Sequence, residues 1–379
     1  MAARAFPKPD DLGKAAKDLG FGTQEGFDGH WNFLATIGEG KFGHAGLWVQ
    51  YDAEARITNR TIIKEAYPKP AQWTNRREWY DMKGRLPKEV HIHRTLSRAP
   101  RAWAVAGFLG WSLSEERRMY RVYMPYYPHG DFGNLIWEHA KLEGARDENG
   151  EDVCPLIPAS AIWCFFEALA AAACLMRDGA LPGQQPPGDW EGEVVHMDIK
   201  PINVFLDTAH QDRWRTIPMA KLGDFGLAMY RNAPGIRNPD QMVGRGTVGY
   251  QAPEQVRQTG GEPYRFRVTS KSDVYSIGKS LLSLMDLQSG DRVQTYGYDD
   301  VPIPPRVRDF YPPGLVSLLE QCLEDEPTHR IVADDLLRAI TDEVAVGLDG
   351  IDSTPLKFQS RSGNRPLRVK ADIYEAFAK

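Results

Sequence analysis

The sequence has little cysteine and little net charge, and each absence excludes a class of protein. Only four of its 379 residues are cysteine, and none lies in a C-x-x-C pair or near a histidine at zinc spacing, which argues against a zinc site. A net charge of −5 gives no electrostatic reason to expect a nucleic-acid or membrane partner. We expect reduced, mostly buried thiols at Cys154, Cys164, Cys174 and Cys322.

Long uncharged hydrophobic runs are also missing. The longest apolar run, residues 159–176, contains Glu167 and many alanines, so it predicts a buried helix rather than a membrane span. Residues 1–11 lack the apolar region of a signal peptide, and Asp10 and Asp11 argue against a transit peptide. We therefore expect an intracellular protein, cytoplasmic or nuclear.

The length and the 42% of apolar residues suit one bilobal unit or two domains. Residues 1–30 show little periodicity and are interpreted as an extension. A strand-rich half follows and ends near a linker at 126–130, which fits neither helical nor strand periodicity. Its predicted elements are strands at 37–49, 59–64, 108–113 and 119–124, a polar turn at 52–56 and a helix at 87–98.

Beyond the linker the pattern is mostly helical. Two polar stretches, residues 143–155 and 178–193, are interpreted as surface insertions, and the second is rich in proline and glycine and so predicts an irregular loop. The predicted elements are helices at 131–142, 159–177, 270–286, 313–323 and 333–345, with short strands near 203–206 and 219–222.

Chemically suited side chains concentrate in residues 196–203, followed by an Asp-Phe-Gly triplet that begins at Asp224. Asp198 could accept a proton from an attacking hydroxyl, and Lys200 could neutralise a transferring phosphoryl group. Asn203 and Asp224 offer the hard oxygen ligands that magnesium prefers. The packing of apolar strand residues does not require these charged and amide groups, whereas phosphoryl transfer does.

A glycine-rich turn precedes this string in the chain. Gly38, Gly40 and Gly43 spell G-x-G-x-x-G, which two unrelated nucleotide-binding folds use. A dinucleotide-binding fold would need a helix directly after the glycines, but residues 45–49 continue as a strand. Lys64 on the next strand could then reach the α- and β-phosphates, although a lysine at a strand end is more often only solvated.

An anion is needed to orient Lys64, and two glutamates compete for this role. Glu89 lies beside an apolar stripe of a predicted helix, whereas Glu78 would leave an overlong path to the strand near residue 108. We favour Glu89, and Glu78 stays open as the alternative.

In this order the motifs resemble those of the eukaryotic-type protein kinases over residues 33–340. The resemblance implies an α+β, bilobal protein-kinase-like fold. The N-lobe would be 31–124, with a small β-sheet and one helix, and the larger, mostly helical C-lobe 125–344, with extensions at 1–30 and 345–379. It also implies ATP and Mg²⁺ as cofactors and a protein hydroxyl as the phosphate acceptor, with Asp198 and Lys200 as catalytic residues.

The same resemblance assigns roles to further residues. Glu254, in Ala-Pro-Glu, would close the activation segment and pair with Arg330, and Asp273 would brace the catalytic loop. Thr247 and Lys200 resemble the serine/threonine branch. The nucleotide would be held by Ile37, Gly38, Gly40, Gly43, Ala45, Ile62, Lys64, Glu89, Met124, Pro125, Tyr127 and Phe205.

The chain departs from the family pattern around the nucleotide and the helix. Ala45 and Ile62 exchange the usual large and small residues, and Phe205 gives a bulky floor, so ATP is expected to fit while inhibitor selectivity is atypical. His93 stands where an apolar side chain usually links the helix to Phe225. It is interpreted as a packed neutral histidine, with a pH-sensitive position as the alternative.

The departure with the largest consequence is Met197, where most members carry an arginine that holds a phosphorylated activation loop. Residues 231–246 also contain no Ser, Thr or Tyr. Both absences lead to the hypothesis that activity does not require activation-loop phosphorylation, with Thr247 as a substrate-side contact. A pseudokinase scaffold and a small-molecule kinase remain alternatives, and the sequence leaves the substrate, the activator and the oligomeric state open.

Overall fold

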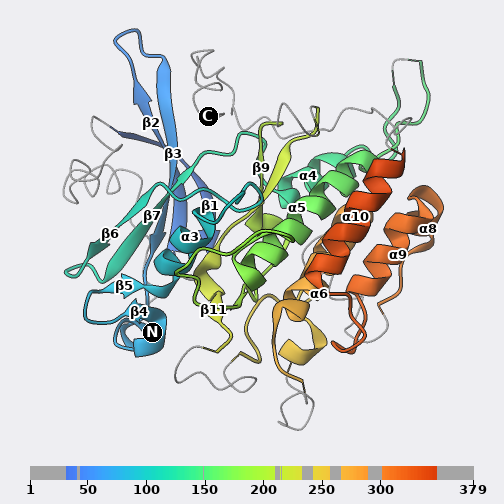
Figure 1. Ribbon diagram of the computed structural model, residues 1–379. Coiled ribbons are helices and arrows are strands. Elements are labelled where there is room, and N and C mark those ends of the chain that lie inside the picture. The colour runs from blue at the N-terminus through green and yellow to red at the C-terminus, as the bar shows by residue number, and fades with distance from the viewer. Residues whose placement is uncertain are drawn as a thin grey trace. The chain divides into compact units, whose positions relative to one another are not determined.

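The computed structural model describes residues 31–40, 43–147, 149–209, 214, 216–232, 242–256, 266–288 and 301–347 (Figure 1). These ranges fall into two compact units, one of residues 31–90 with 107–126 and one of residues 91–106 with 127–347. The lobes at 31–124 and 125–344 stay predictions, and the two compact units differ from them in dividing at 126/127 and in placing residues 91–106 with the second unit. The predicted extension 1–30, and all but the first three residues of the extension 345–379, lie outside the described residues.

The first unit is built on a five-stranded antiparallel sheet with strand order β1-β2-β3-β7-β6 (Figure 1). Its strands are β1 Asn32–Gly40, β2 Gly43–Tyr51, β3 Ile57–Ala66, β6 Gly110–Ser114 and β7 Met119–Pro125. The prediction of one strand over 37–49 was wrong, because the chain reverses between Gly40 and Gly43, which pair with each other. A Cβ on Gly43 would lie 1.8 Å from the Glu65 carbonyl oxygen, so only glycine lets β2 and β3 approach this closely.

A compact segment connects β3 to the first long helix. It contains α2 Pro70–Trp73, the 3₁₀ turn η1 Arg76–Glu78, the strand pair β4 Trp79–Asp81 and β5 Leu86–Pro87, and it leads into α3 Lys88–Ser97. The helix predicted at 87–98 is confirmed to within one residue at each end. The short elements before it were not predicted, because two- to four-residue pieces carry no periodicity.

The second unit is mainly helical (Figure 1). Its helices are α4 Phe132–Ala140, α5 Ala159–Asp178, α6 Ser270–Met285, α8 Pro305–Phe310, α9 Pro313–Cys322 and α10 Ala333–Gly347. Short elements are β8 Val194–Val195, β9 Val204–Asp207, β10 Met219–Leu222, β11 Met229–Tyr230, and the 3₁₀ turns η2 Pro201–Asn203, η3 Phe225–Leu227 and η4 Pro253–Gln255. All five predicted helices are present within two residues at each end, whereas α8, β8 and β11 were missed.

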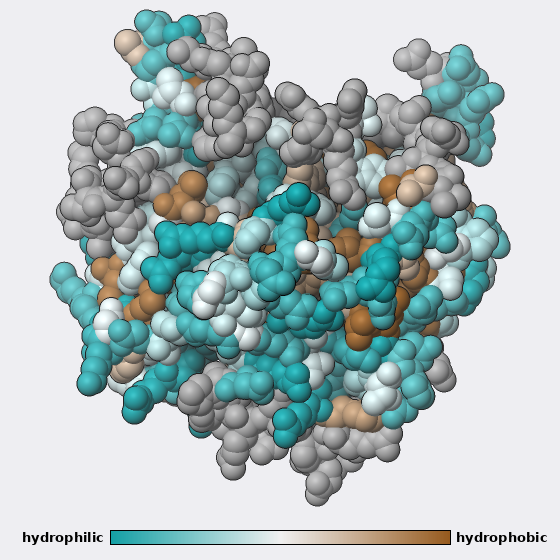
Figure 2. Space-filling view, viewed as in Figure 1, coloured by the Kyte–Doolittle hydropathy of each residue, from teal (hydrophilic) through white to brown (hydrophobic). Residues whose placement is uncertain are grey.

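Helix α5 forms the centre of this unit and packs against α6, α10 and β10. It is long and apolar enough to cross a membrane by length and composition, yet 89% of that stretch is buried inside the protein, as expected for a core helix. Cys164, Cys174 and Cys322 are buried free thiols, and Cys154 is exposed. The face seen in Figure 2 is mostly hydrophilic, with hydrophobic residues in small separate groups.

A buried charge cluster holds three strands of the first sheet together. Glu65 of β3, which is 2% exposed, accepts hydrogen bonds from Arg121 Nε at 2.7 Å and from Tyr67 Oη at 2.6 Å. His44 Nε2 of β2 lies 3.1 Å from the same carboxylate. Burial alone would raise the pKa of Glu65, but the His44 hydrogen bond and the Arg121 charge outweigh it and lower the pKa to about 2.

The low pKa of Glu65 predicts an acid-dependent stability. Because an ordinary glutamate titrates near 4.5, the stabilisation is present above that pH and is lost as pH falls toward 2, by about 3 kcal/mol in total. Glu65→Gln is therefore expected to unfold at lower urea concentration at neutral pH and to show a flatter loss of stability between about pH 5 and about pH 2. Urea unfolding across this range, with exposed Glu54→Gln as control, measures it. Parallel curves for wild type and Glu65→Gln would contradict the assignment.

Candidate active site

In the first unit, the predicted phosphate-binding lysine pairs with a glutamate, and a tyrosine holds that glutamate. Lys64 Nζ lies 2.5 Å from Glu89 Oε1, and Tyr120 Oη donates to Glu89 Oε2 at 2.7 Å. Glu89 is nearly buried, with a side chain 6% exposed, so this ion pair is shielded from water. The structure thus pairs Lys64 with the glutamate favoured from the sequence, and Glu78 lies instead in η1. Tyr120 was missed, because its role depends on the neighbouring strand.

The predicted nucleotide-contacting side chains of this unit share one apolar cluster. Ile62 and Met124 are buried in it, and Ile37 and Ala45 pack against it. Ile62 pairs with Met124 across β3 and β7, and Thr61 Oγ1 donates to the Met124 carbonyl at 3.0 Å. Gly38 has open space around the position of a Cβ, whereas residues 41 and 42 of the glycine turn lie outside the described residues.

In the second unit, a buried aspartate fixes the start of the catalytic loop. Asp273 of α6 accepts the backbone N–H of His196 at 2.8 Å and that of Met197 at 3.0 Å. His196 is fully buried and burial lowers its pKa, so the ring is neutral. Its Nε2 donates to the Gly223 carbonyl at 3.0 Å and its Nδ1 accepts the Asp198 N–H at 3.3 Å. One imidazole therefore links the loop to the strand end before Asp224.

Asp198, Lys200 and Thr247 converge, although Thr247 lies 47 residues beyond Lys200. Thr247 Oγ1 donates to Asp198 Oδ1 at 2.6 Å and accepts from Lys200 Nζ at 2.7 Å. Lys200 Nζ also lies 2.9 Å from Asp198 Oδ2. The side chains of Asp198 and Lys200 are 12% and 17% exposed, so neither is fully buried. The sequence placed Thr247 near the substrate but did not predict these two hydrogen bonds.

Asn203 and Asp224 lie at the same end of a two-stranded ribbon. Asn203 directly precedes β9, Asp224 follows β10 by two residues, and the strands pair Val204 with Leu222. The Gly223 N–H donates to the Asn203 carbonyl at 2.9 Å. Asn203 Nδ2 donates to the Asp198 carbonyl at 2.8 Å, which leaves Oδ1 as the ligand atom of that amide. This pair of hard oxygen donors suits Mg²⁺, which retains waters and takes further oxygens from phosphates.

Aromatic packing supports these strand ends. Phe225 is fully buried, with ring centroids 5.1 Å from His93 and 5.2 Å from His196. His93 is 2% exposed and hydrogen-bonds to the Ala106 carbonyl at 2.8 Å, as expected for a packed histidine. Phe205 stacks on Tyr127 at 5.4 Å, and a Cβ on Gly223 would meet the Phe205 ring at 2.6 Å.

Met197, which directly precedes Asp198, is 1% exposed in an apolar cluster with Val195, Met229, Met242 and Val268. These residues come from β8, the catalytic loop, β11, the activation segment and the stretch before α6. The backbone is fixed as well, since Gln255 Nε2 donates to the Met197 carbonyl at 3.2 Å. Hydrophobic packing therefore joins the loop that carries Asp198 to the segment that carries Met242.

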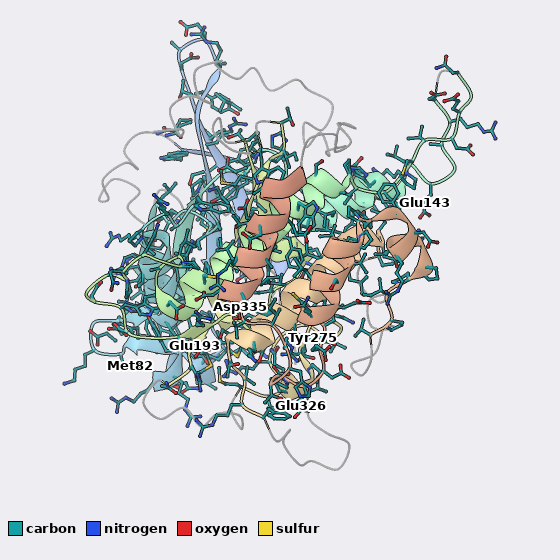
Figure 3. The ribbon with its side chains drawn as sticks, turned by 45° about the vertical axis from the view of Figure 1, so that its right-hand side comes forward. Met82, Glu143, Glu193, Tyr275, Glu326 and Asp335 are labelled. Carbon is teal, nitrogen blue, oxygen red and sulfur yellow. The ribbon has the colours of Figure 1, made fainter. Side chains whose placement is uncertain are left out.

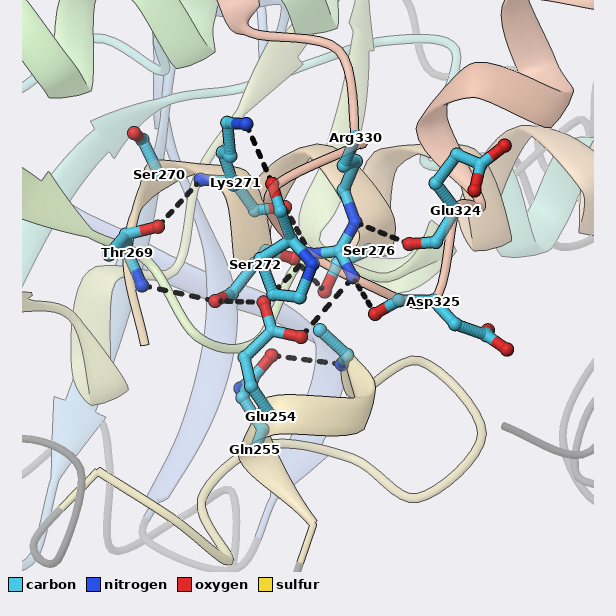
Figure 4. A network of polar contacts seen from close by, with 12 residues as sticks. Glu254, Gln255, Thr269, Ser270, Lys271, Ser272, Ser276, Glu324, Asp325 and Arg330 are labelled. Carbon is cyan, nitrogen blue, oxygen red and sulfur yellow. Dashed lines mark hydrogen bonds and ion pairs between the residues drawn. The ribbon is translucent and has the colours of Figure 1, made fainter. Parts of the chain in front are cut away.

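The predicted pair of Glu254 and Arg330 lies at the buried centre of a network of polar contacts (Figure 4). Arg330 donates to both carboxylate oxygens of Glu254, at 2.7 and 3.2 Å, and both side chains are 0% exposed. Ser272 Oγ donates to the same carboxylate at 2.6 Å. The guanidinium lies 4.9 Å from the ring centroid of Tyr275, which is labelled in Figure 3. Its remaining bonds go to the carbonyls of Glu324, Lys271 and Asp325.

Residues 190–339 match the family model described as the protein kinase domain. The chain is 27% identical over 254 residues to the G2-specific protein kinase fin1 of Schizosaccharomyces pombe, covering 65% of this chain and 29% of the relative. It is 31% identical over 196 residues to the serine/threonine-protein kinase PkaA of Streptomyces coelicolor, with coverages of 51% and 30%. It is 37% identical over 106 residues to the receptor-like protein kinase 5 of Arabidopsis thaliana, with coverages of 26% and 9%.

Residues 190–339 thus match the protein kinase domain, and the α+β make-up of the chain, with an antiparallel sheet in one unit and mainly helices in the other, is that expected of a bilobal kinase fold. The chain spans less than a third of the length of each of these three curated relatives.

The buried pair predicts a large stability effect. Arg330→Met leaves the Glu254 carboxylate without a cation in a water-excluded site, and we expect the free energy of unfolding to fall by about 3–5 kcal/mol. The double variant with Glu254→Gln should recover part of this loss, because no charge is then left buried. Urea unfolding measures both, and Arg338→Ala, which breaks an exposed pair with Asp335, should change stability by less than about 0.5 kcal/mol. A similar small change in Arg330→Met would contradict the role of the pair.

Proposed function

We propose that this chain is an ATP- and Mg²⁺-dependent serine/threonine protein kinase. The observation that carries the proposal is the convergence of Asp198, Lys200 and Thr247 beside the two oxygen donors Asn203 and Asp224. This arrangement offers a base, a cation and metal ligands together, which phosphoryl transfer needs and general packing does not.

Each residue has a defined task in the proposed reaction. Asp198 accepts the proton of the attacking hydroxyl, whose oxygen bonds to the γ-phosphorus as the bond to the ADP oxygen breaks. Lys200 stabilises negative charge on the transferring group. Bound Mg²⁺ would neutralise phosphate charge, with Asn203 and Asp224 as its protein ligands.

The first unit would bind the nucleotide phosphates. Lys64 presents its ammonium to the α- and β-phosphates, and Glu89, itself held by Tyr120, orients that ammonium. The glycine turn supplies backbone amides. The phosphate acceptor would be a serine or threonine hydroxyl of a protein substrate, and the nucleotide would be held by the residues named for it from the sequence.

Asp198→Asn tests the proposed base. The amide keeps the shape but cannot accept the proton, so kcat should fall by about 10²–10⁴-fold while the melting temperature stays close to that of wild type. Purified protein with Mg-ATP and a mixed peptide library measures it, with Asp335→Asn on the exposed side of α10 as the control (Asp335 is labelled in Figure 3).

Two outcomes would reject the proposal. Wild-type protein that phosphorylates neither itself nor any peptide, and so matches Asp198→Asn, would favour the scaffold alternative. Phosphate transfer confined to small molecules would favour a small-molecule kinase.

We propose in addition that activity does not depend on a phosphorylated activation loop. Three observations support this. Residues 231–246 contain no hydroxyl side chain. Met197 lies in an apolar cluster with Met242. Arg231, beyond β11, donates to Glu193 at 2.7 Å, and its own N–H donates to the Glu193 carbonyl at 2.8 Å (Glu193 is labelled in Figure 3). Packing and an internal carboxylate would then replace the phosphate.

Protein dephosphorylated with a phosphatase that is then removed should start phosphorylating peptides at the wild-type initial rate. Met242→Ser, which places a hydroxyl in the apolar cluster, should lower that rate while Asp198 and Lys200 stay in place. Initial-rate assays with mass spectrometry of residues 231–247 measure both. Activity that disappears on dephosphorylation and returns together with phosphate on Thr247 would refute this part of the proposal.

A further inference from the structure

The segment between β3 and α3, residues 67–87, has an aromatic core of its own within the first unit. Trp73 and Trp79 are each 6% exposed and meet edge to face, with ring centroids 5.0 Å apart. Trp79 Nε1 donates to the Trp73 carbonyl at 3.0 Å. The segment directly connects the strand of Lys64 to the helix of Glu89, so its conformation sets where that helix begins.

Arg85, near the end of this segment, stacks on both indole rings. Its guanidinium carbon lies 4.7 Å from the Trp73 ring centroid and 4.2 Å from that of Trp79. The backbone at Arg85 has a φ of 54°, a left-handed conformation that costs a non-glycine residue energy and persists only where its surroundings enforce it. Arg85 lies one residue before β5, and β5 runs directly into α3 (Figure 1).

The same guanidinium reaches back to the sheet. Arg85 Nε donates to Glu115 Oε1 at 2.5 Å and Nη2 donates to Oε2 at 2.6 Å, with Glu115 in the turn between β6 and β7. An exposed ion pair alone contributes little to stability. This pair is bidentate, and its guanidinium also stacks on two indole rings, so its geometry is fixed. Strand β7 carries Tyr120, which holds Glu89 itself.

We propose that Arg85 is a positioning residue that anchors the start of α3 to the sheet and so keeps Glu89 on Lys64. The inference rests on the proposed kinase function, because it concerns the residue that orients the phosphate-binding lysine. Leu86, next to Arg85, packs against the apolar cluster that contains Val90 of α3, so a shift of Arg85 is transmitted directly to the first turn of the helix. This device is internal to the chain and needs no modification.

The test compares Arg85→Ala and Arg85→Lys with wild type and with Glu89→Gln. Arg85→Ala should lower kcat/KM for ATP by about tenfold, and Arg85→Lys should lower it too, because lysine has neither the planar fork nor the flat stacking surface. In a Glu89→Gln background, Arg85→Ala should change kcat/KM by less than about twofold, because Arg85 acts through Glu89. Arg338→Ala is the matched control, since it breaks an exposed ion pair outside this unit.

Hydrogen exchange of the amides of residues 92–94, which in a helix bond to the carbonyls of residues 88–90, gives a readout that does not need activity. We expect these amides to exchange faster in Arg85→Ala than in wild type, and the effects of Arg85→Ala and Glu89→Gln on kcat/KM to be non-additive. Full additivity with Glu89→Gln, or a lower melting temperature with unchanged kcat/KM and unchanged exchange, would overturn the positioning role. A wild-type protein without kinase activity would refute the proposed function, while the exchange measurement would still decide whether Arg85 fixes the start of α3.

Discussion

The second unit depends on one buried carboxylate, that of Asp273. It accepts two consecutive backbone N–H groups at the start of the catalytic loop, and burial raises its pKa to about 7 despite these bonds. Met197, whose N–H is the second of these two groups and which directly precedes Asp198, has a φ of 66°, which a long side chain rarely adopts. The aspartate thus holds a strained turn in place directly before Asp198.

Helix α6 supports the activation segment with the same polar face. Ser272, one residue before Asp273, donates to Glu254, and Ser276 donates to the Tyr250 carbonyl at 2.8 Å. A Cβ on Gly246 would lie 2.4 Å from the Met197 carbonyl oxygen, and Gly246 has a φ of +101°, so only glycine fits there. The helix therefore aligns the catalytic loop and the end of the activation segment, because both are bonded to neighbouring turns of one rigid element.

Much of this arrangement could be predicted from the sequence, and the omissions have physical causes. The long periodic helices follow from spacing along single elements. Glu89 was favoured as the partner of Lys64 because it lies beside an apolar stripe of a predicted helix and because Glu78 would leave an overlong path to the next strand. The bonds of Thr247 and the surroundings of Met197 do not follow from spacing. Thr247 lies 49 positions from Asp198, and Met229, Met242 and Val268 lie 32, 45 and 71 positions from Met197, so only the folded chain brings them together. Residues 37–49 were predicted as one strand because the sequence pattern did not reveal that the chain reverses between Gly40 and Gly43. Arg85 was overlooked because its partners lie in elements too short for periodicity to reveal.

Because of the cluster around Met197, the contact between the catalytic loop and the activation segment should depend on temperature rather than on salt concentration. A clamp made of charges weakens as ionic strength rises. A cluster of three methionines and two valines, all at most 1% exposed, is indifferent to salt but loses strength on cooling, because burial of apolar surface is driven mainly by the entropy of water near room temperature. Low temperature, rather than high salt, is therefore the condition that loosens this contact.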